Sequence, residues 1–254
     1  MTVLDDILAA TRSECARLRG SPPKGIPHTP ADVTTALRRN GALHLIAEIK
    51  RRSPSAGALS TVLPITERAA IYAREGAAMI SVLVDREHFA GGYEDLSAVR
   101  GVVPTPLLAK GFAIDAVQID AARRSGADAV LIIVRIVDDA SLRDLVATAV
   151  GVGLTPIVEV VDELELDRAL DCDAVVIGVN ARDLSTLAMD RDRAARVLSR
   201  IPRDRVSLWF SGVGSPDEVR AIAGTKVDGA LIGEALMRRD DPAELLRAMV
   251  VATR

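Results

Sequence analysis

The first long apolar run of the chain and the turn after it read HLIAEIKRRSPSAG, from His44 to Gly57. Residues 45–49 are apolar apart from Glu48, a composition typical of a strand covered on both faces in a parallel sheet. Glu48 and Lys50 are two residues apart, so the period of a strand puts both side chains on one face, where they can pair. A buried strand that ends in charged residues predicts a functional edge, because burying charge without a partner is costly.

Similar short, β-branched runs recur along the 254 residues, and helix-patterned segments separate them. The predicted strands are His44–Lys50, Met79–Asp85, Pro106–Lys110, Ala129–Val134, Thr155–Val161, Ala174–Asn180, Arg205–Gly212 and Gly229–Glu234. The helical segments include Ile65–Gly76, Ala116–Gly126, Ser141–Gly151, Glu163–Leu170, Arg191–Leu198 and Ser215–Ile222. Eight successive βα units of this size predict an α/β protein, a closed (β/α)8 TIM barrel with its active site at the strand C-termini.

The region before the first strand has a different character. Met1–Gly20 has charges throughout and reads as an amphipathic helix, and four prolines between residues 22 and 30 follow it. We interpret residues 1–43 as an N-terminal helical extension and linker that covers one end of the barrel, and residues 44–254 as the barrel. The prolines mark a linker on an added segment, so residues 1–254 are predicted to form a single domain.

Composition excludes several classes of protein. The formal charge is -3 with no long block of one sign, so we expect no nucleic-acid surface. The start lacks the features of a signal peptide and no run is long enough to span a bilayer, so we expect a cytoplasmic protein without membrane contact. Two cysteines without CxxC spacing and three scattered histidines give no metal-ligand pattern. The expected partner is a small molecule, and the expected assembly is a monomer or weak homodimer.

Polar residues at the predicted strand ends are the candidate catalytic groups. Besides Glu48 and Lys50, these are Lys110, Glu159, Asn180, Arg182 and Ser211. In a closed barrel they converge at one mouth, where two lysines and two carboxylates shift one another's pKa values, as general acids and bases require. The alternative interpretation is that the lysines and glutamates are ion pairs that fill the barrel interior.

Glycines follow the last two predicted strands, in Ser211-Gly212-Val213-Gly214-Ser215 and Ile232-Gly233-Glu234-Ala235. Glycine lets backbone N–H groups approach an anion, and these two loops are where phosphate-binding barrels place that group. Five of the six aromatic residues, Phe89, Tyr93, Phe112, Trp209 and Phe210, fall at or just after strand ends. They predict an apolar pocket for a ring-bearing substrate, or else packing of the barrel top beneath the N-terminal helix.

The chain resembles the indole-3-glycerol phosphate synthase family over essentially its whole length. The strongest segment is Ile46 to Gly57, IAEIKRRSPSAG. Supporting segments are Phe89-Ala90-Gly91-Gly92, Lys110-Gly111-Phe112, Gly126 to Leu131 (GADAVL), Val158-Glu159-Val160, Ile177 to Leu184 (IGVNARDL) and Leu231 to Met237 (LIGEALM).

The resemblance implies a carboxy-lyase that cyclises 1-(2-carboxyphenylamino)-1-deoxyribulose 5-phosphate to indole-3-glycerol phosphate with loss of CO2 and water, without a cofactor or a metal. Lys110 is then the general acid at the ketone, and Glu48 and Lys50 handle protons in the dehydration. Glu159 and Asn180 orient these groups, and Arg182 and Ser211 complete the polar wall. The phosphate is expected on Ser53, Gly212, Gly233 and Glu234, and the ring against Pro54, Phe89, Phe112, Leu131 and Leu184, with Phe210 also in the binding pocket.

Several positions depart from the family's usual pattern. Gly111 stands in place of the acid after the catalytic lysine, and Phe210 in place of a cavity glutamate. Val161, Ala181 and Gly92 replace a histidine, an asparagine and a serine. Losing two acids lowers the negative charge around the lysines. The alternatives are therefore a paralogue that acts on a modified anthranilate-derived substrate, a non-catalytic phosphate-ligand-binding barrel, or a phosphosugar isomerase that leaves the Glu48 and Lys50 motif unexplained.

Overall fold

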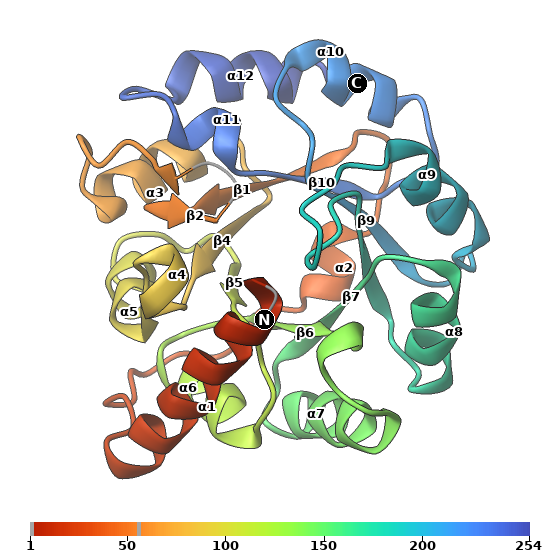
Figure 1. Ribbon diagram of the computed structural model, residues 1–254. Helices are drawn as coiled ribbons and strands as arrows, with labels where there is room; N and C mark the ends of the chain where they lie inside the picture. Colours follow the sequence, from red (N-terminus) through yellow and green to blue (C-terminus); the bar gives the residue numbers. More distant parts are fainter. Residues whose placement is uncertain (1–2, 55–56) are drawn as a thin grey trace.

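The computed structural model describes residues 3–54 and 57–254, and within them eight parallel strands close into a barrel (Figure 1). The order around the ring is β1-β10-β9-β8-β7-β6-β5-β4, which confirms the predicted (β/α)8 fold. Ile46 of β1 pairs with Leu231 of β10 on one side and with Met79 of β4 on the other, which closes the ring. The strands are β1 (His44–Ile49), β4 (Met79–Leu83), β5 (Leu107–Lys110), β6 (Ala129–Ile133), β7 (Thr155–Val160), β8 (Val176–Asn180), β9 (Val206–Phe210) and β10 (Gly229–Ile232).

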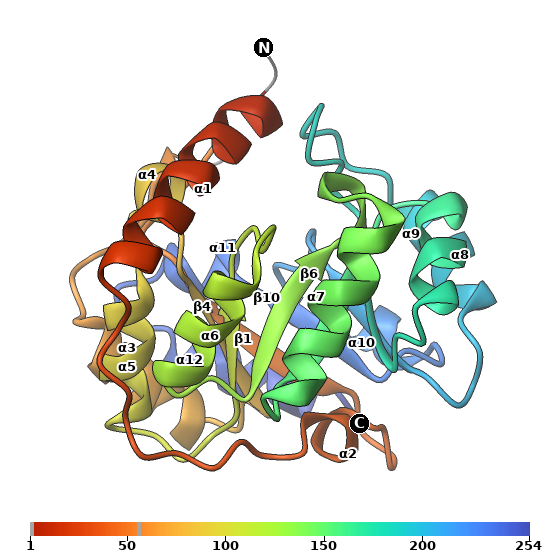
Figure 2. The ribbon, with the colours of Figure 1, turned by 90° about the horizontal axis from the view of Figure 1, so that it is seen from below.

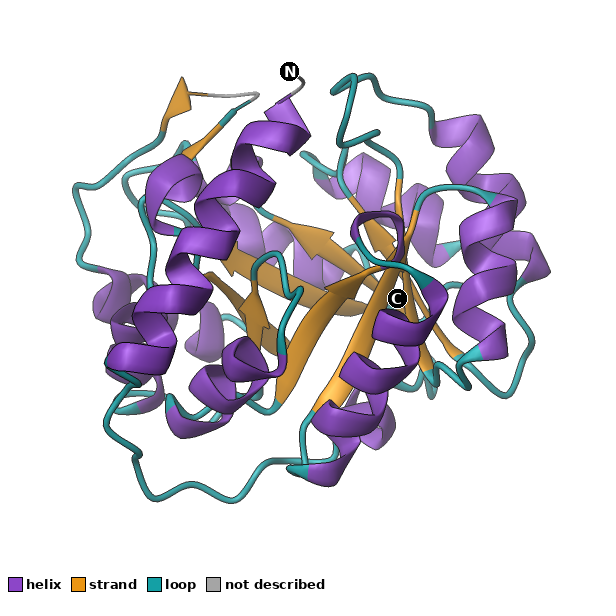
Figure 3. Cartoon of the chain, turned by 60° about the horizontal axis from the view of Figure 1, so that its bottom comes forward, coloured by secondary structure: helices purple, strands orange, loops and turns teal. Residues whose placement is uncertain are grey.

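Helices surround the strands on the outside, as Figure 3 shows. They are α3 (Ile65–Arg74), α4 (Arg86–Phe89), α5 (Tyr93–Arg100), α6 (Ala116–Arg124), α7 (Asp139–Gly151), α8 (Glu163–Asp171), α9 (Arg191–Arg200), α10 (Pro216–Ala223), α11 (Glu234–Met237) and α12 (Ala243–Val251), with a 3-10 turn, η1 (Val134–Ile136). Aspartates begin four of the long helices, because each side chain accepts a hydrogen bond from a backbone N–H of the first turn. None of the described helices is long and apolar enough to cross a membrane.

The predicted element boundaries hold to within a few residues. One difference at a strand end is in β9, which ends at Phe210 and not at the predicted Gly212. Ser211 and Gly212 adopt φ values of 68° and 74°, in the left-handed region that an extended strand does not use. The chain therefore turns sharply where β9 reaches the mouth of the barrel.

Side chains along each strand alternate between two apolar cores. In β1, Leu45, Ala47 and Ile49 pack outward under the helices, whereas Ile46 packs inside the barrel with Met79 and other inward residues. Glu48 shares the inward face of Ile46 because strand side chains repeat with a period of two. The barrel interior is thus apolar near the strand N-termini and charged near the C-termini.

The N-terminal extension covers both ends of the barrel (Figure 2). Helix α1 (Val3–Gly20) places Ile7 at the C-terminal mouth, and Met1 and Thr2 of the predicted helix lie outside the described residues. Helix α2 (Val33–Leu37) was not predicted; its Val33 and Leu37 are fully buried and pack with inward-facing strand residues. The linker is held by Asp128, whose Oδ1 accepts a hydrogen bond from the Ala31 N–H at 2.7 Å.

Candidate active site

A cavity of about 460 Å³ lies at the C-terminal ends of the strands. Its polar lining comes from β1, β5, β7 and β8, and its apolar lining includes Ile7 of α1. All the predicted site residues except Leu131 line this one cavity: Glu48, Lys50, Ser53, Pro54, Phe89, Lys110, Phe112, Glu159, Asn180, Arg182, Leu184, Phe210, Ser211, Gly212, Gly233 and Glu234. The structure thus brings together residues that span most of the barrel sequence.

Leu131 is the exception among the predicted ring-binding residues. It is buried in the interior core of the barrel, and Ile133 lines the cavity instead. The two residues share the inward face of β6, but Ile133 lies two positions nearer the C-terminal end of the strand. The apolar contact at this strand therefore comes from the last inward-facing residue.

Glu48 and Lys50 form the predicted pair on β1, with Glu48 Oε1 2.5 Å from Lys50 Nζ. Burial acts to raise the pKa of Glu48, but the charges of Lys50 and Lys110 and the hydrogen bond from Lys50 outweigh it and lower this pKa. The pair lies directly against the backbone of Gly233, where a Cβ atom would come 2.3 Å from Glu48 Oε1. A carboxylate kept ionised in a buried site is a suitable proton acceptor.

Lys110 and Glu159 form a second, looser pair across the cavity. Lys110 Nζ lies 3.8 Å from Glu159 Oε2, and Glu159 Oε1 accepts a hydrogen bond of 2.9 Å from the Asn180 side-chain amide. Glu159 Oε2 is buried and has no hydrogen-bond partner among the described residues. Because a buried acceptor seldom stays unpaired, this oxygen is available to a ligand or to a shift of the lysine.

Three of the five aromatic residues predicted at the mouth line the cavity, namely Phe89, Phe112 and Phe210. The centroids of the Phe89 and Phe112 rings lie 5.9 Å apart, and Phe112 also packs in one core cluster with Ile7 of α1. These rings thus line the cavity and, at Phe112, also pack beneath α1. Tyr93 and Trp209 do not line this cavity: the Tyr93 hydroxyl donates to the Gln118 carbonyl, and Trp209 packs in the outer core.

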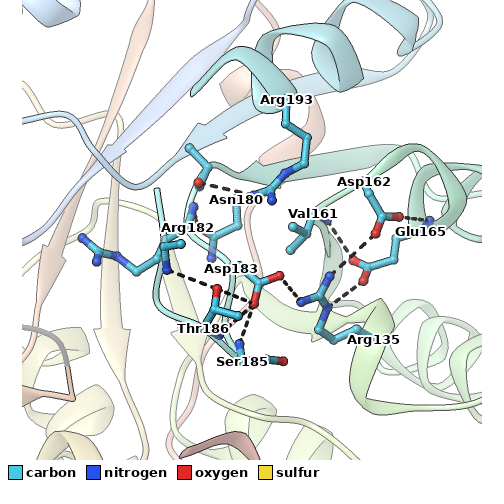
Figure 4. A network of polar contacts seen from close by, with 12 residues as sticks. Arg135, Val161, Asp162, Glu165, Asn180, Arg182, Asp183, Ser185, Thr186 and Arg193 are labelled. Carbon is cyan, nitrogen blue, oxygen red and sulfur yellow. Dashed lines mark hydrogen bonds and ion pairs between the residues drawn. The ribbon is translucent and has the colours of Figure 1, made fainter. Parts of the chain in front are cut away.

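The loop after β8 carries Arg182 and Leu184 into the cavity, and Arg135 anchors it from the neighbouring η1 turn (Figure 4). Arg135 donates hydrogen bonds of 2.7 Å to both Asp183 and Glu165. Asp183 Oδ1 in turn accepts from the backbone N–H groups of Ser185 and Thr186, at 2.8 and 3.0 Å. One arginine thus fixes the turn that presents the next side chains to the cavity.

Two arginines at the rim were not predicted from the sequence. Arg191 donates a hydrogen bond of 2.6 Å to the Gly212 carbonyl, and Arg238 pairs with Glu234 at 2.7 Å. Both line the cavity beside the predicted phosphate loops. Arg238 stands four residues after Glu234, on the same helical face, and this spacing was the available signal.

Comparison with known sequences agrees with the motif resemblance. The profile of the family described as "Indole-3-glycerol phosphate synthase" matches residues 4–249. The chain belongs to the indole-3-glycerol phosphate synthase family. A relative of that name from Mycobacterium ulcerans is 40% identical, with 99% of this chain and 94% of the relative covered. Another, from Nocardioides sp., is 42% identical, with 98% of each chain covered.

Solved structures agree with the fold. The 3-hexulose-6-phosphate synthase of Salmonella typhimurium superposes with a TM-score of 0.67 at 16% identity, over 83% of this chain and 98% of that one. The thiamine phosphate pyrophosphorylase of Pyrococcus furiosus gives 0.63 at 15% identity, over 84% and 96%. At these identities the likeness shows the barrel architecture alone.

Two of the departures from the pattern of the indole-3-glycerol phosphate synthase family lie in the cavity wall, at Gly111 and Phe210. A Cβ atom at Gly111 would come 2.9 Å from Val84 Cγ2, so a longer side chain there requires Val84 to move. Val161 and Ala181 are buried, and Gly92 is the residue that precedes α5. The wall beside Lys110 is consequently less acidic than in the family's usual pattern.

Proposed function

We propose that this protein acts as an indole-3-glycerol phosphate synthase and closes the indole ring of 1-(2-carboxyphenylamino)-1-deoxyribulose 5-phosphate with loss of CO2 and water. The observation that carries the proposal is that two lysine–carboxylate pairs converge at the mouth of a barrel of this family. The nitrogen and oxygen lie 2.5 Å apart in the first pair and 3.8 Å apart in the second. The substrate supplies the carboxylate, the ketone and the ring nitrogen that the reaction uses, so the chemistry needs only acid and base groups.

In the first step the ring carbon that bears the carboxylate attacks the ketone carbon. A C–C bond forms, and the carbonyl oxygen takes a proton from Lys110. Loss of CO2 then returns the bonding electrons to the ring and restores its aromaticity. Glu159, held by Asn180 at 2.9 Å, faces Lys110 and offsets the positive charge of the lysine and of the iminium form of the ring.

In the second step the new hydroxyl leaves as water and a proton leaves the adjacent carbon that came from the sugar. Lys50 donates the proton to the departing hydroxyl, and Glu48 accepts the proton from carbon. The lowered pKa of Glu48 keeps it ionised for this role, and its 2.5 Å contact places donor and acceptor side by side.

Binding divides between the two sides of the cavity. The phosphate lies on Ser53 and on the backbone of Gly212, Gly233 and Glu234, with the guanidinium groups of Arg191 and Arg238 at the rim, where they pair with Glu218 and Glu234. The ring lies against the apolar side formed by Pro54, Phe89, Phe112, Leu184 and Ile133. Arg182 and Ser211 complete the polar wall, and the expected ligand is a small phosphorylated aromatic molecule.

The test is turnover of the carboxyphenylamino-deoxyribulose phosphate, followed by the fluorescence of the indole product. We expect product from the parent and a loss on the order of 10²–10⁴-fold in kcat for Lys110→Met, because a positioned general acid contributes about that much. Lys226→Met is the matched control, since Lys226 does not line the cavity. Binding of the substrate without any product from the parent would instead support the non-catalytic barrel.

A second candidate is supported by Phe210, which gives the cavity an apolar face where the family's pattern has a carboxylate. In this case the protein works on an anthranilate-derived substrate with an apolar group on its ring. The same assay with ring-methylated substrates distinguishes the two. A kcat/KM above that of the unsubstituted substrate favours the paralogue, and a lower value favours the standard reaction.

A further inference from the structure

The chain has only four lysines, Lys24, Lys50, Lys110 and Lys226, and two of them line the cavity. Those two are held in different ways. The ammonium of Lys50 is in close contact with Glu48 at 2.5 Å, whereas the carboxylate nearest to Lys110 is Glu159, at 3.8 Å. A distance of 3.8 Å is too long for a hydrogen bond, so the ion pair alone does not fix the position of the Lys110 ammonium.

The ammonium of Lys110 also contacts the ring of Phe210, whose centroid lies 5.9 Å from Nζ. A cation within about 6 Å of an aromatic face is attracted by the ring quadrupole, and the attraction grows where water is excluded. Phe210 is 1% exposed. The ring attracts the charge but offers no lone pair, so it can hold the ammonium in place without accepting a hydrogen bond from it.

The orientation of this ring is set by Gly178 on the neighbouring strand. A Cβ atom at Gly178 would come 2.5 Å from one ring carbon of Phe210 and 2.7 Å from another. Phe210 pairs in register with Asn180, two residues further along β8. The absence of a side chain at Gly178 therefore provides the space that the ring occupies, and Phe210 is fixed as firmly as the strand that carries it.

We propose that Phe210 is a positioning residue for Lys110: its ring face holds the ammonium beside Glu159, while the N–H groups stay available to a substrate. This inference rests on the proposed function, in which Lys110 donates a proton to the ketone. Glu159 from β7 and Glu48 from β1 also act on this ammonium, while Lys50 and Arg182 add positive charge to the same cavity.

The test observes Lys110 directly. Four lysines give a simple NMR spectrum when the side chains carry ¹³C at Cε, and Lys110→Arg assigns its signal. In the parent we expect a ring-current displacement of the Lys110 signal. In Phe210→Leu and Phe210→Met, which keep an apolar side chain of similar volume, the displacement disappears.

Phe112→Leu is the matched control, because it removes another ring from the same cavity that is not stacked on Lys110. Its Lys110 signal should keep the displacement seen in the parent. Gly178→Ala keeps Phe210 but displaces the ring, and should resemble Phe210→Leu. A Lys110 signal that keeps its parental position in both Phe210 variants overturns the proposal.

Kinetics add a second readout. In the Phe210 variants we expect kcat to fall, with a smaller change in KM, because the position of the proton donor is affected more than substrate binding. If the parent gives no indole product while the NMR responses appear, the proposed reaction fails and the contact stands. If the parent is active and the Lys110 signal ignores Phe210, the contact fails and the reaction stands.

Discussion

Replacing Glu48 with glutamine removes a charge from the β1 pair and leaves the volume of the side chain almost unchanged. The amide cannot accept the proton that dehydration releases, and Lys50 loses the carboxylate that lies 2.5 Å from it. We expect kcat to fall on the order of 10²–10⁴-fold with a smaller change in KM. Steady-state kinetics with fluorescence detection of indole measure both.

Asp217→Asn is the control for Glu48→Gln. Its side chain is 90% exposed and pairs with Arg220 one turn along the same helix, so its kcat should equal that of the parent. A Glu48→Gln variant that keeps more than about a tenth of the parental kcat would remove Glu48 from the role of general base.

Single residues also show how far the sequence predicts the site. The period of two along a strand correctly predicts that Glu48 and Lys50 share a face, and it places Leu131 inward as well. This period does not show how near to the mouth of the barrel an inward side chain lies, because the tilt and stagger of the strands decide that position. Ile133 therefore lines the cavity in place of Leu131. Arg191 reaches the rim from a helix, through a long side chain whose direction the sequence does not specify.

At the scale of the elements, the loop after β8 depends on Arg135. Arg135→Met leaves Asp183 and Glu165 without the guanidinium that joins them at 2.7 Å each. Arg182 and Leu184, which line the cavity, then lose their fixed backbone. We expect KM to rise about tenfold with a smaller change in kcat, since interactions lost at a binding loop act first on affinity. Trypsin should also cleave faster after Arg182.

Arg143→Met provides the comparison for Arg135→Met. It removes the same charge from an exposed position on α7, and it should change neither KM nor the cleavage after Arg182. If Arg135→Met behaves like Arg143→Met in both measurements, the loop is held by its own backbone turn and not by the arginine.

The same loop predicts a pH dependence of stability. Burial acts to raise the pKa of Asp183, but hydrogen bonds from Arg135 and from the Thr186 and Ser185 N–H groups outweigh it, and the pKa falls from 3.8 to about 2. A carboxyl whose pKa is lower in the folded state stabilises it above pH 3.8, and this contribution is lost as the pH falls through about 2. We expect Asp183→Asn to lower the free energy of unfolding at pH 7 by about 1 kcal/mol, because solvent screens part of the interaction between Asp183 and Arg135.

Urea unfolding of the parent and of Asp183→Asn at a series of pH values measures this difference. The two free energies of unfolding should differ by a constant amount from pH 7 down to about pH 5 and should converge below pH 4. A difference that grows as the pH falls would show that the ionised carboxyl of Asp183 does not stabilise the folded state.

Elements were predicted best where a helix or strand has its own periodicity. The eight strands alternate with helices, and aspartates cap the first turns of four of the long ones, so the order and many of the boundaries follow from local signals. Helix α2 was missed because its five residues, Val33–Leu37, are too few for a periodic pattern and follow a proline-rich linker. Its formation depends on the barrel end that buries Val33 and Leu37, and no local pattern reports that contact.

At the scale of the whole molecule, two aspartates tie the linker to the N-terminal end of the barrel. Asp128 precedes β6 and accepts from the N–H of Leu107 at the start of the neighbouring β5; Asp228 precedes β10 and accepts from the N–H of Ser207 near the start of β9. Their other oxygens accept from the N–H groups of Ala31 and Arg39 in the extension. These hydrogen bonds join the extension to the barrel.

The two ends of the barrel therefore have separate tasks, and one pair of variants tests this separation. Leu37 of α2 is fully buried at the N-terminal end, so Leu37→Ala should lower the free energy of unfolding by about 2–5 kcal/mol. Its KM should stay at the parental value, because the cavity lies at the opposite end. Ile7 of α1 is 4% exposed and lines the cavity, so Ile7→Ala should raise KM in addition to any loss of stability.

Urea unfolding and steady-state kinetics on both variants, at a temperature where each is folded, measure the two effects together. The separation holds if the kinetic change appears in Ile7→Ala alone. It fails if Leu37→Ala raises KM as much as Ile7→Ala does. Packing of α2 at the N-terminal end of the barrel would then affect the geometry of the cavity through the strands. In (β/α)8 barrels, residues at the C-terminal face usually carry out the chemistry, and residues at the N-terminal face usually stabilise the fold. The positions of α1 and α2 extend this division to the N-terminal segment (Figure 2).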